Sequence, residues 1–112
     1  MAVTVKELVH PVYLTNVNVT YYTANKCRTL IDKCTVRNND FVNQIVIISL
    51  LTAGGDTAPS VILTRSLAPG ETYLCPEVVG HELDSGSSIT AQTLVGDAHV
   101  ALRVSGREVT GI

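Results

Sequence analysis

The sequence predicts an all-β protein, a single domain built as a two-sheet sandwich of jelly-roll type. The 112 residues suit one domain with one core, because domains usually contain roughly 100–150 residues. Short stretches rich in apolar and β-branched residues alternate with turn-forming pairs, at the spacing typical of an all-β sandwich or barrel. About seven or eight such strands with several long connections favour the jelly roll.

Individual strands can be placed from their residue patterns. Residues 41–51 are apolar or β-branched at nearly every position, which predicts a strand buried on both faces with Phe41 in the core. Val100, Leu102 and Val104 alternate with small or charged residues, so they are expected to share one face of a strand. Residues 76–83 are the one candidate for a short helical turn. The turn signals are Asn38-Asn39-Asp40, Gly54-Gly55-Asp56, Pro69-Gly70, Ser85-Gly86 and Gly96-Asp97.

Residues 1–16 are interpreted as an N-terminal arm ahead of a β-sandwich domain spanning residues 17–112. The arm is apolar, and Pro11 excludes a central strand there because proline donates no ladder hydrogen bond. We expect the arm to pair at a sheet edge or to dock on a neighbouring subunit, contributing to assembly rather than to the core. Adjacent Tyr21 and Tyr22 face opposite sides of a strand, so at most one of them lies deep in the core. The other is available for a protein interface. The candidate interface residues are Val9, Val12, Tyr13, Leu14, Tyr21 and Tyr22.

Charge, hydropathy and cysteine content narrow the function classes. A net charge of −2 disfavours a protein that grips nucleic acid through its phosphates. The longest apolar run is too short to span a bilayer, and no signal peptide is visible. Three cysteines without Cys-x-x-Cys spacing predict reduced thiols. In one continuous strand, Cys27 would face away from Cys34, and Arg28 would point away from Lys33 and Arg37.

No catalytic, metal-binding or cofactor-binding constellation emerges from the sequence. His10, His81 and His99 are far apart and lack the His-x-His pattern of cupin-type metal sites. The nucleophile motif Gly-x-Ser-x-Gly and the phosphate loop Gly-x-x-x-x-Gly-Lys are both missing. We therefore expect a non-enzymatic protein with no catalytic residues, no metal and no cofactor.

Four ordered segments carry a family resemblance. They are Tyr22-Thr23-Ala24, Leu67-Ala68-Pro69-Gly70-Glu71-Thr72-Tyr73, Pro76-Glu77-Val78-Val79-Gly80 and Leu102-Arg103-Val104-Ser105-Gly106-Arg107-Glu108-Val109, with Leu83, Gly86 and Ile89 between the last two. Their order and spacing resemble small virion structural proteins of tailed bacteriophages, over most of the chain from Tyr22 onward. Residues 25–34 depart from that pattern, because charges and cysteines replace small residues. In size the chain is similar to the capsid stapling (cement) proteins of epsilon15-like podoviruses.

The resemblance implies a jelly-roll-like fold and a role as a capsid decoration or cement protein on the outer surface of the virion, made in the host bacterial cytoplasm. The partner would be the major capsid protein, and a homodimer is favoured if copies occupy local two-folds. No nucleic-acid or membrane partner is expected. The alternative is a head-tail neck, tail or fibre module. The number of copies per virion would distinguish a decoration protein from such a module. A glycan-binding jelly roll is less favoured because sugars usually stack on Trp, and the chain has none.

Overall fold

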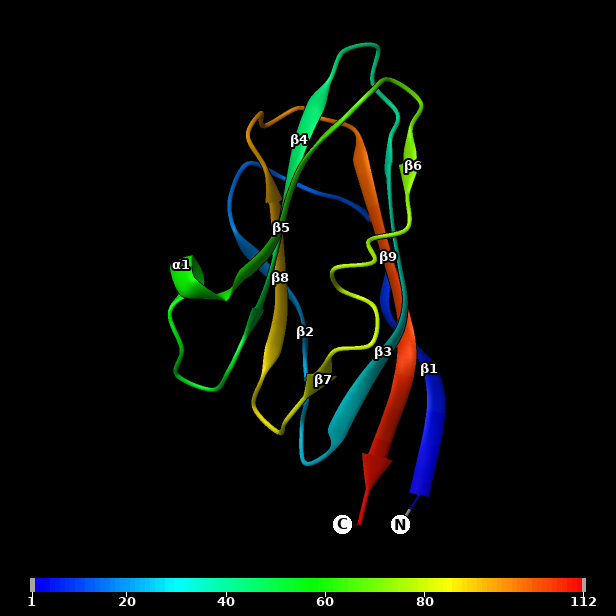
Figure 1. The fold of residues 1–112 in the computed structure, drawn as a ribbon, viewed down its shortest axis with the longest axis vertical. Helices are drawn as coiled ribbons and strands as arrows, with labels where there is room; N and C mark the ends of the chain where they lie inside the picture. The colour runs from blue at the N-terminus through cyan, green and yellow to red at the C-terminus, as the bar shows by residue number, and fades with distance from the viewer. Residues whose placement is uncertain (1, 112) are drawn as a thin grey trace.

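The computed structural model describes residues 2–111, which form two antiparallel β-sheets packed face to face (Figure 1). The larger sheet contains β1 (Ala2–Tyr13), β3 (Arg28–Asn38), β6 (Thr72–Tyr73), β7 (Glu82–Leu83) and β9 (Val100–Thr110). The smaller sheet contains β2 (Val19–Thr23), β4 (Gln44–Leu51), β5 (Val61–Leu67) and β8 (Ser88–Thr93). One helical turn, α1 (Thr57–Ser60), lies between β4 and β5. The two outermost residues of the predicted arm and domain, Met1 and Ile112, lie outside the described residues.

The strand order is that of a jelly roll. The larger sheet runs β1-β9-β3-β6, with β7 also pairing with β3, and the smaller sheet runs β2-β8-β4-β5. The chain therefore pairs like one long hairpin, β1 with β9, β2 with β8, β3 with β6 and β4 with β5, rolled so that the pairs fall alternately in the two sheets. This arrangement confirms the predicted fold class.

The core lies between the inner faces of the two sheets. Val100, Leu102 and Val104 of β9 are fully buried there, as their alternation predicted. Val46 and Ile48 of β4 face them from the other sheet and are equally buried. Along β9 each of these buried residues is separated from the next by one that faces outward, which is the alternation of a strand with one face in the core.

The strand predicted over residues 41–51 is shorter than expected. It begins at Gln44, and Phe41 lies in the preceding turn with 98% of its surface exposed. The prediction that Phe41 belongs to the core is therefore wrong. The outward-facing Ile45 and Ile47 are half-buried, so β4 is fully buried on its inner face alone.

A β-bulge in β3 changes which of its side chains share a face. The ladder between β3 and β9 pairs Ile31 with Gly106 and then Lys33 with Ser105, so the register shifts at Asp32. An extra residue reverses the alternation beyond it. Cys27 and Cys34 are consequently both buried rather than on opposite faces, and the three cysteines are free. For the same reason Arg28, Lys33 and Arg37 all point outward, which corrects the prediction that they would not share a face.

Gly106 occupies a second constrained position beside this bulge. A Cβ atom there would lie 2.1 Å from the carbonyl oxygen of Leu30 and 2.9 Å from a methyl group of Leu8. Carbon atoms do not approach backbone oxygens so closely, so any side chain at this position would push β9 away from β3. The residue type is therefore set by the close packing of the two strands.

The predicted N-terminal arm is an edge strand of the larger sheet. β1 pairs with β9 from Ala2 to Tyr13. Pro11 is accommodated because β1 is an edge strand among residues 2–111 and its ladder is irregular between Val9 and Val12. Leu8, Val9 and Leu14 are buried in the core between the sheets. Edge pairing was one of the two expected outcomes, but the prediction that the arm contributes nothing to the core is wrong for these three side chains.

Candidate functional site

The six residues predicted to form an interface separate into three groups. Val9, Leu14 and Tyr22 are core residues and are covered by the protein itself. Val12 and Tyr21 are partly buried against the core. Tyr13 is half-exposed and lies at the end of the sandwich where β1 turns toward β2.

Tyr13 belongs to a larger apolar surface, which we call the loop end. It comprises residues 13–17, 39–43 and 94–99, the connections β1–β2, β3–β4 and β8–β9, toward the upper end of the molecule in Figure 1. Its exposed apolar side chains are Tyr13, Val17, Phe41, Val42, Leu94 and Val95. All six have between 47% and 98% of their surface exposed. Exposed apolar side chains gathered from three connections are typical of a protein-interaction surface.

The three connections touch one another. The ring of Tyr13 meets the ring of His99 edge-on with centroids 5.2 Å apart, which links β1–β2 to β8–β9. The backbone N–H of Asn39 donates to the His99 carbonyl at 2.8 Å, which links β3–β4 to the same connection. A groove of about 400 Å³ lies between the β3–β4 and β8–β9 connections. Its lining includes Phe41, Val42, Val95 and His99. The three connections therefore meet at one end of the sandwich, and Phe41, Val42 and Val95 share one groove.

Asn38 fixes the turn that carries Phe41. Its side-chain amide is fully buried and donates to the carbonyls of Val42 at 2.8 Å and Leu67 at 3.0 Å. Its amide oxygen accepts the backbone N–H of Asp40 at 2.9 Å. A buried amide with both ends engaged holds the turn in one conformation. The backbone of the turn that carries Phe41 is therefore fixed, and the Phe41 side chain projects from it into water.

Asp40 ties the same turn to the β8–β9 connection. One carboxylate oxygen accepts the backbone N–H of His99 at 2.7 Å and the Gln44 amide at 3.0 Å, and the other lies 2.8 Å from Nδ1 of His99. The backbone and side-chain hydrogen bonds from His99 hold the pKa of the Asp40 carboxyl below its usual value. Asp40 therefore accepts hydrogen bonds as a carboxylate at neutral pH. This cross-link orders the groove beside Phe41.

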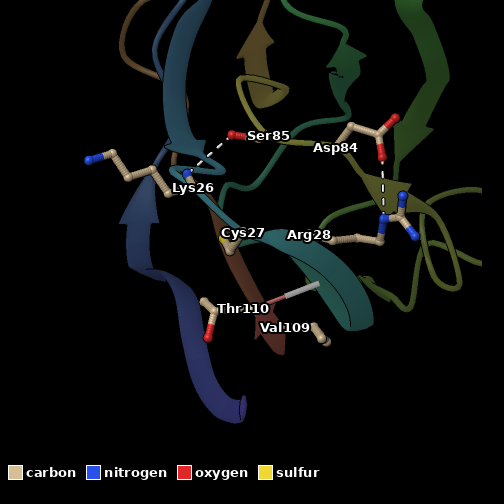
Figure 2. Close-up of a pocket in the computed structure, with 8 residues that line it drawn as sticks. Lys26, Cys27, Arg28, Asp84, Ser85, Val109 and Thr110 are labelled. Carbon is tan, nitrogen blue, oxygen red and sulfur yellow. Dashed lines mark hydrogen bonds and ion pairs between the residues drawn. The ribbon is translucent and has the colours of Figure 1, made fainter. Parts of the chain in front are cut away.

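A second depression, of about 200 Å³, lies at the opposite end of the sandwich (Figure 2). Figure 2 shows that the ammonium group of Lys26 points away from the other lining residues, and that Arg28 turns toward Asp84, 3.4 Å away. The Ser85 hydroxyl accepts the backbone N–H of Lys26 at 3.1 Å, which stabilises the left-handed backbone of that residue. Arg28 also pairs with Glu82 at 2.6 Å, so two carboxylates engage its guanidinium. The arrangement of this depression supports the turn that precedes β3.

Behind that depression, a polar network joins the two sheets. The hydroxyl of Tyr22 lies 2.6 Å from the Thr29 hydroxyl and donates to the Glu108 carboxylate at 2.5 Å, while Lys6 pairs with Glu108 at 3.3 Å. Burial, reinforced by the neighbouring carboxylate, raises the pKa of Tyr22. Tyr22 is therefore neutral at physiological pH and acts as a hydrogen-bond donor between the sheets.

Within residues 2–111, no group of three or more His, Cys, Asp or Glu side chains is placed to hold a metal ion. In the same part of the chain, none of the helical segments has the length and apolar character needed to cross a membrane. Searches against protein-family models, curated proteins and solved structures found no match to this chain.

The sequence prediction missed most of the loop end. Phe41 and Val42 are enclosed by Asn and Asp residues, and Leu94 and Val95 directly precede the turn signal Gly96-Asp97. Turn residues on both sides of an apolar pair place that pair at a loop tip, where it cannot enter the core. Phe41 and Val42 carry this signal on both sides, whereas Leu94 and Val95 carry it on one side, so it would have identified the first two of the six side chains.

Proposed function

We propose that this protein is a virion structural protein of a tailed bacteriophage that binds the outer capsid lattice, decorating and cementing it against DNA pressure. The partner is the major capsid protein, and a homodimer is the favoured state. The observation that carries the docking role is the loop end, where Phe41 is almost completely exposed yet held by Asn38 and Asp40. The family resemblance supports the virion setting, and viral capsid domains commonly use the jelly roll.

Rigid display of an apolar surface suits a clamp. A turn whose backbone is fixed before binding loses little backbone conformational entropy when its exposed aromatic side chain enters a pocket on a partner. Aromatic side chains in such pockets supply much of the binding energy of protein interfaces. Because binding occurs to the assembled lattice, each bound copy stabilises the closed shell by mass action. Many modest contacts then add up to substantial resistance to internal pressure.

The decisive test is reconstitution on capsids that lack the protein. Adding wild-type protein should load many copies over the whole shell and raise the temperature at which the particles release DNA. Phe41→Ser should bind at least about 30-fold more weakly, because losing an aromatic anchor costs about 2 kcal/mol or more. Leu74→Ser is the matched control, since Leu74 is 60% exposed but lies outside the loop end.

The outcomes separate the proposal from its rival. If copies occur solely at the tail vertex, the protein is a neck or tail component. If depleted and complete particles release DNA at the same temperature, it is not a cement protein. If Leu74→Ser weakens binding as much as Phe41→Ser, the loop end is not the docking surface.

A further inference from the structure

We propose that the outer face of the larger sheet carries a second binding site, one that takes the carboxylate side chains of an acidic protein segment. Four side chains of β3 and β9 build it. They are Lys33, Thr35, Arg103 and Ser105. This inference rests on the sheet face and stands independently of the docking role proposed for the loop end.

The β-bulge in β3 creates the site. Beyond Asp32 the alternation is reversed, so Lys33 and Thr35 face outward together with Ser105 and Arg103 of the neighbouring strand. Lys33 is paired with Ser105 and Thr35 with Arg103, as cross-strand neighbours. Side chains in such pairs stand about 5 Å apart, and successive pairs on one face about 7 Å apart. Four hydrogen-bond donors thus surround one groove of about 360 Å³.

These donors are largely unused. Among residues 2–111, the Lys33 ammonium has no ion-pair partner, and the hydroxyls of Thr35 and Ser105 make no side-chain hydrogen bond. Arg103 contacts Glu7 through one terminal nitrogen at 3.0 Å, which leaves other N–H groups of its guanidinium free. A cation beside two hydroxyls and a guanidinium is a site for an oxyanion, because each group donates hydrogen bonds.

The surroundings favour a protein carboxylate over a nucleic-acid phosphate. Asp32 is bonded by Arg107 at 2.9 Å through both of its oxygens, and Glu7 lies beside Arg103, so the face carries negative as well as positive groups. Asp32, Glu7 and the chain's charge of −2 oppose a long phosphate backbone, whose charges follow one another closely at a fixed spacing. A protein segment with few, separated acidic residues can place one carboxylate over the groove without bringing further charges beside Asp32 and Glu7.

The same face extends the site along β3. Arg37 lies four residues beyond Lys33, on the same side of the strand and about 13 Å away along it. Its guanidinium donates to Asn39 and Thr72, both neutral, so its charge is not neutralised by those contacts. The matching partner is therefore an extended segment with two acidic residues spaced to meet Lys33 and Arg37.

A labelled peptide Ser-Glu-Ser-Ser-Ser-Glu-Ser, whose two glutamates lie about 13 Å apart when the peptide is extended, tests the site by fluorescence anisotropy at low ionic strength. Wild-type protein should bind it saturably. Lys33→Gln should weaken binding about tenfold, and Thr35→Val, which removes one hydroxyl without changing charge, should weaken it measurably. Lys26→Gln is the charge-matched control, because Lys26 is exposed on the connection between β2 and β3. Phe41→Ser should bind like wild type, since its change lies at the loop end.

Three results would overturn the inference. One is the absence of saturable binding to the two-glutamate peptide. Another is an equal loss in Lys26→Gln, which would indicate non-specific charge attraction. The third is tighter binding of an oligothymidylate of equal charge, which would assign the face to nucleic acid. None of these results would bear on whether the loop end binds capsids.

Discussion

At the scale of single residues, Asn38 stabilises the conformation of the loop end through the hydrogen bonds of its side chain. Its buried amide serves the carbonyls of Val42 and Leu67 and the backbone N–H of Asp40, all within 3.0 Å. Replacing it with alanine removes these three hydrogen bonds, of which the one to the Leu67 carbonyl is buried. Asn38→Ala should therefore lower the free energy of unfolding by about 2–3 kcal/mol, as measured by urea denaturation.

The control for this prediction lies in the same connection. Asn43 is exposed and makes no side-chain hydrogen bond among the described residues, so Asn43→Ala should change stability by less than about 0.5 kcal/mol. Equal effects of the two substitutions would mean that Asn38 does not organise the turn.

Asp40, Glu71 and Glu108 are among the carboxylates that make folding stability depend on pH. The backbone N–H of Ala68, followed by Arg65, lowers the pKa of Glu71, and the Tyr22 hydroxyl lowers that of Glu108. The hydrogen bonds from His99 do the same for Asp40. Because these groups bind protons less readily when folded, their contribution is present above their unfolded pKa values and is lost as pH falls through the lowered folded values.

We expect the urea midpoint to fall as pH drops below about 4.5, the ordinary pKa of a glutamate. Glu71→Gln should reduce the steepness of that acid fall, since it removes one of the responsible groups. Asp97→Asn, in an exposed residue of the β8–β9 connection, provides the comparison. An acid fall in Glu71→Gln as steep as in wild type would show that Glu71 contributes nothing to it.

At the scale of elements, β1 joins the core through residues that precede the predicted domain boundary at residue 17. Leu14 is 1% exposed, and its backbone N–H donates to the Val100 carbonyl at 2.9 Å. Leu14→Ala should therefore cost about 3 kcal/mol of unfolding free energy, from lost burial and the cavity that remains. Val17→Ala, in an exposed residue three positions later, should cost less than about 0.5 kcal/mol. Near-wild-type stability of Leu14→Ala would restore the interpretation of this segment as a dispensable arm.

Strand positions were predictable from the sequence, whereas their irregularities were not. The alternation of Val100, Leu102 and Val104 determines which face of the strand is buried. Side chains at every second position share one face, and burying that face removes all three apolar side chains from water. The bulge at Asp32 has no comparable signal. It depends on how β9 approaches β3 at Gly106, a contact between residues far apart in sequence. Because the bulge was not predicted, the sheet faces predicted for Arg28, Cys34 and Lys33 relative to one another were wrong.

The candidate site was harder to predict than the fold for a related reason. Apolar residues usually signal the core, so Phe41 was assigned there, and the arm residues were assigned to an interface because proline separated them from a central strand. The structure reverses both assignments for Phe41, Val9 and Leu14. Whether an apolar residue is inside or outside depends on local hydrogen bonding, here that of Asn38, which hydropathy does not record.

At the scale of the whole molecule, shape determines how the protein would stand on a shell. The molecule measures 46 × 26 × 20 Å, and the loop end lies toward one extremity of the long axis, opposite the first residues of β1 and the last of β9 (Figure 1). Docking through the loop end would set the long axis upright. Docking through a sheet face would lay it down on the lattice.

We expect a cryo-electron microscopy difference map between complete and depleted particles to show density rising about 46 Å above each docking position, minus the depth to which Phe41 and its neighbours insert. Upright docking also leaves the outer face of the larger sheet exposed, so Lys33 and Arg103 would remain free to meet an acidic segment from an adjacent protein. Density only about 20–26 Å high would mean that a sheet face lies on the lattice. In that case the loop end would project sideways or outward, and its apolar side chains would be available to a neighbouring copy instead of the shell.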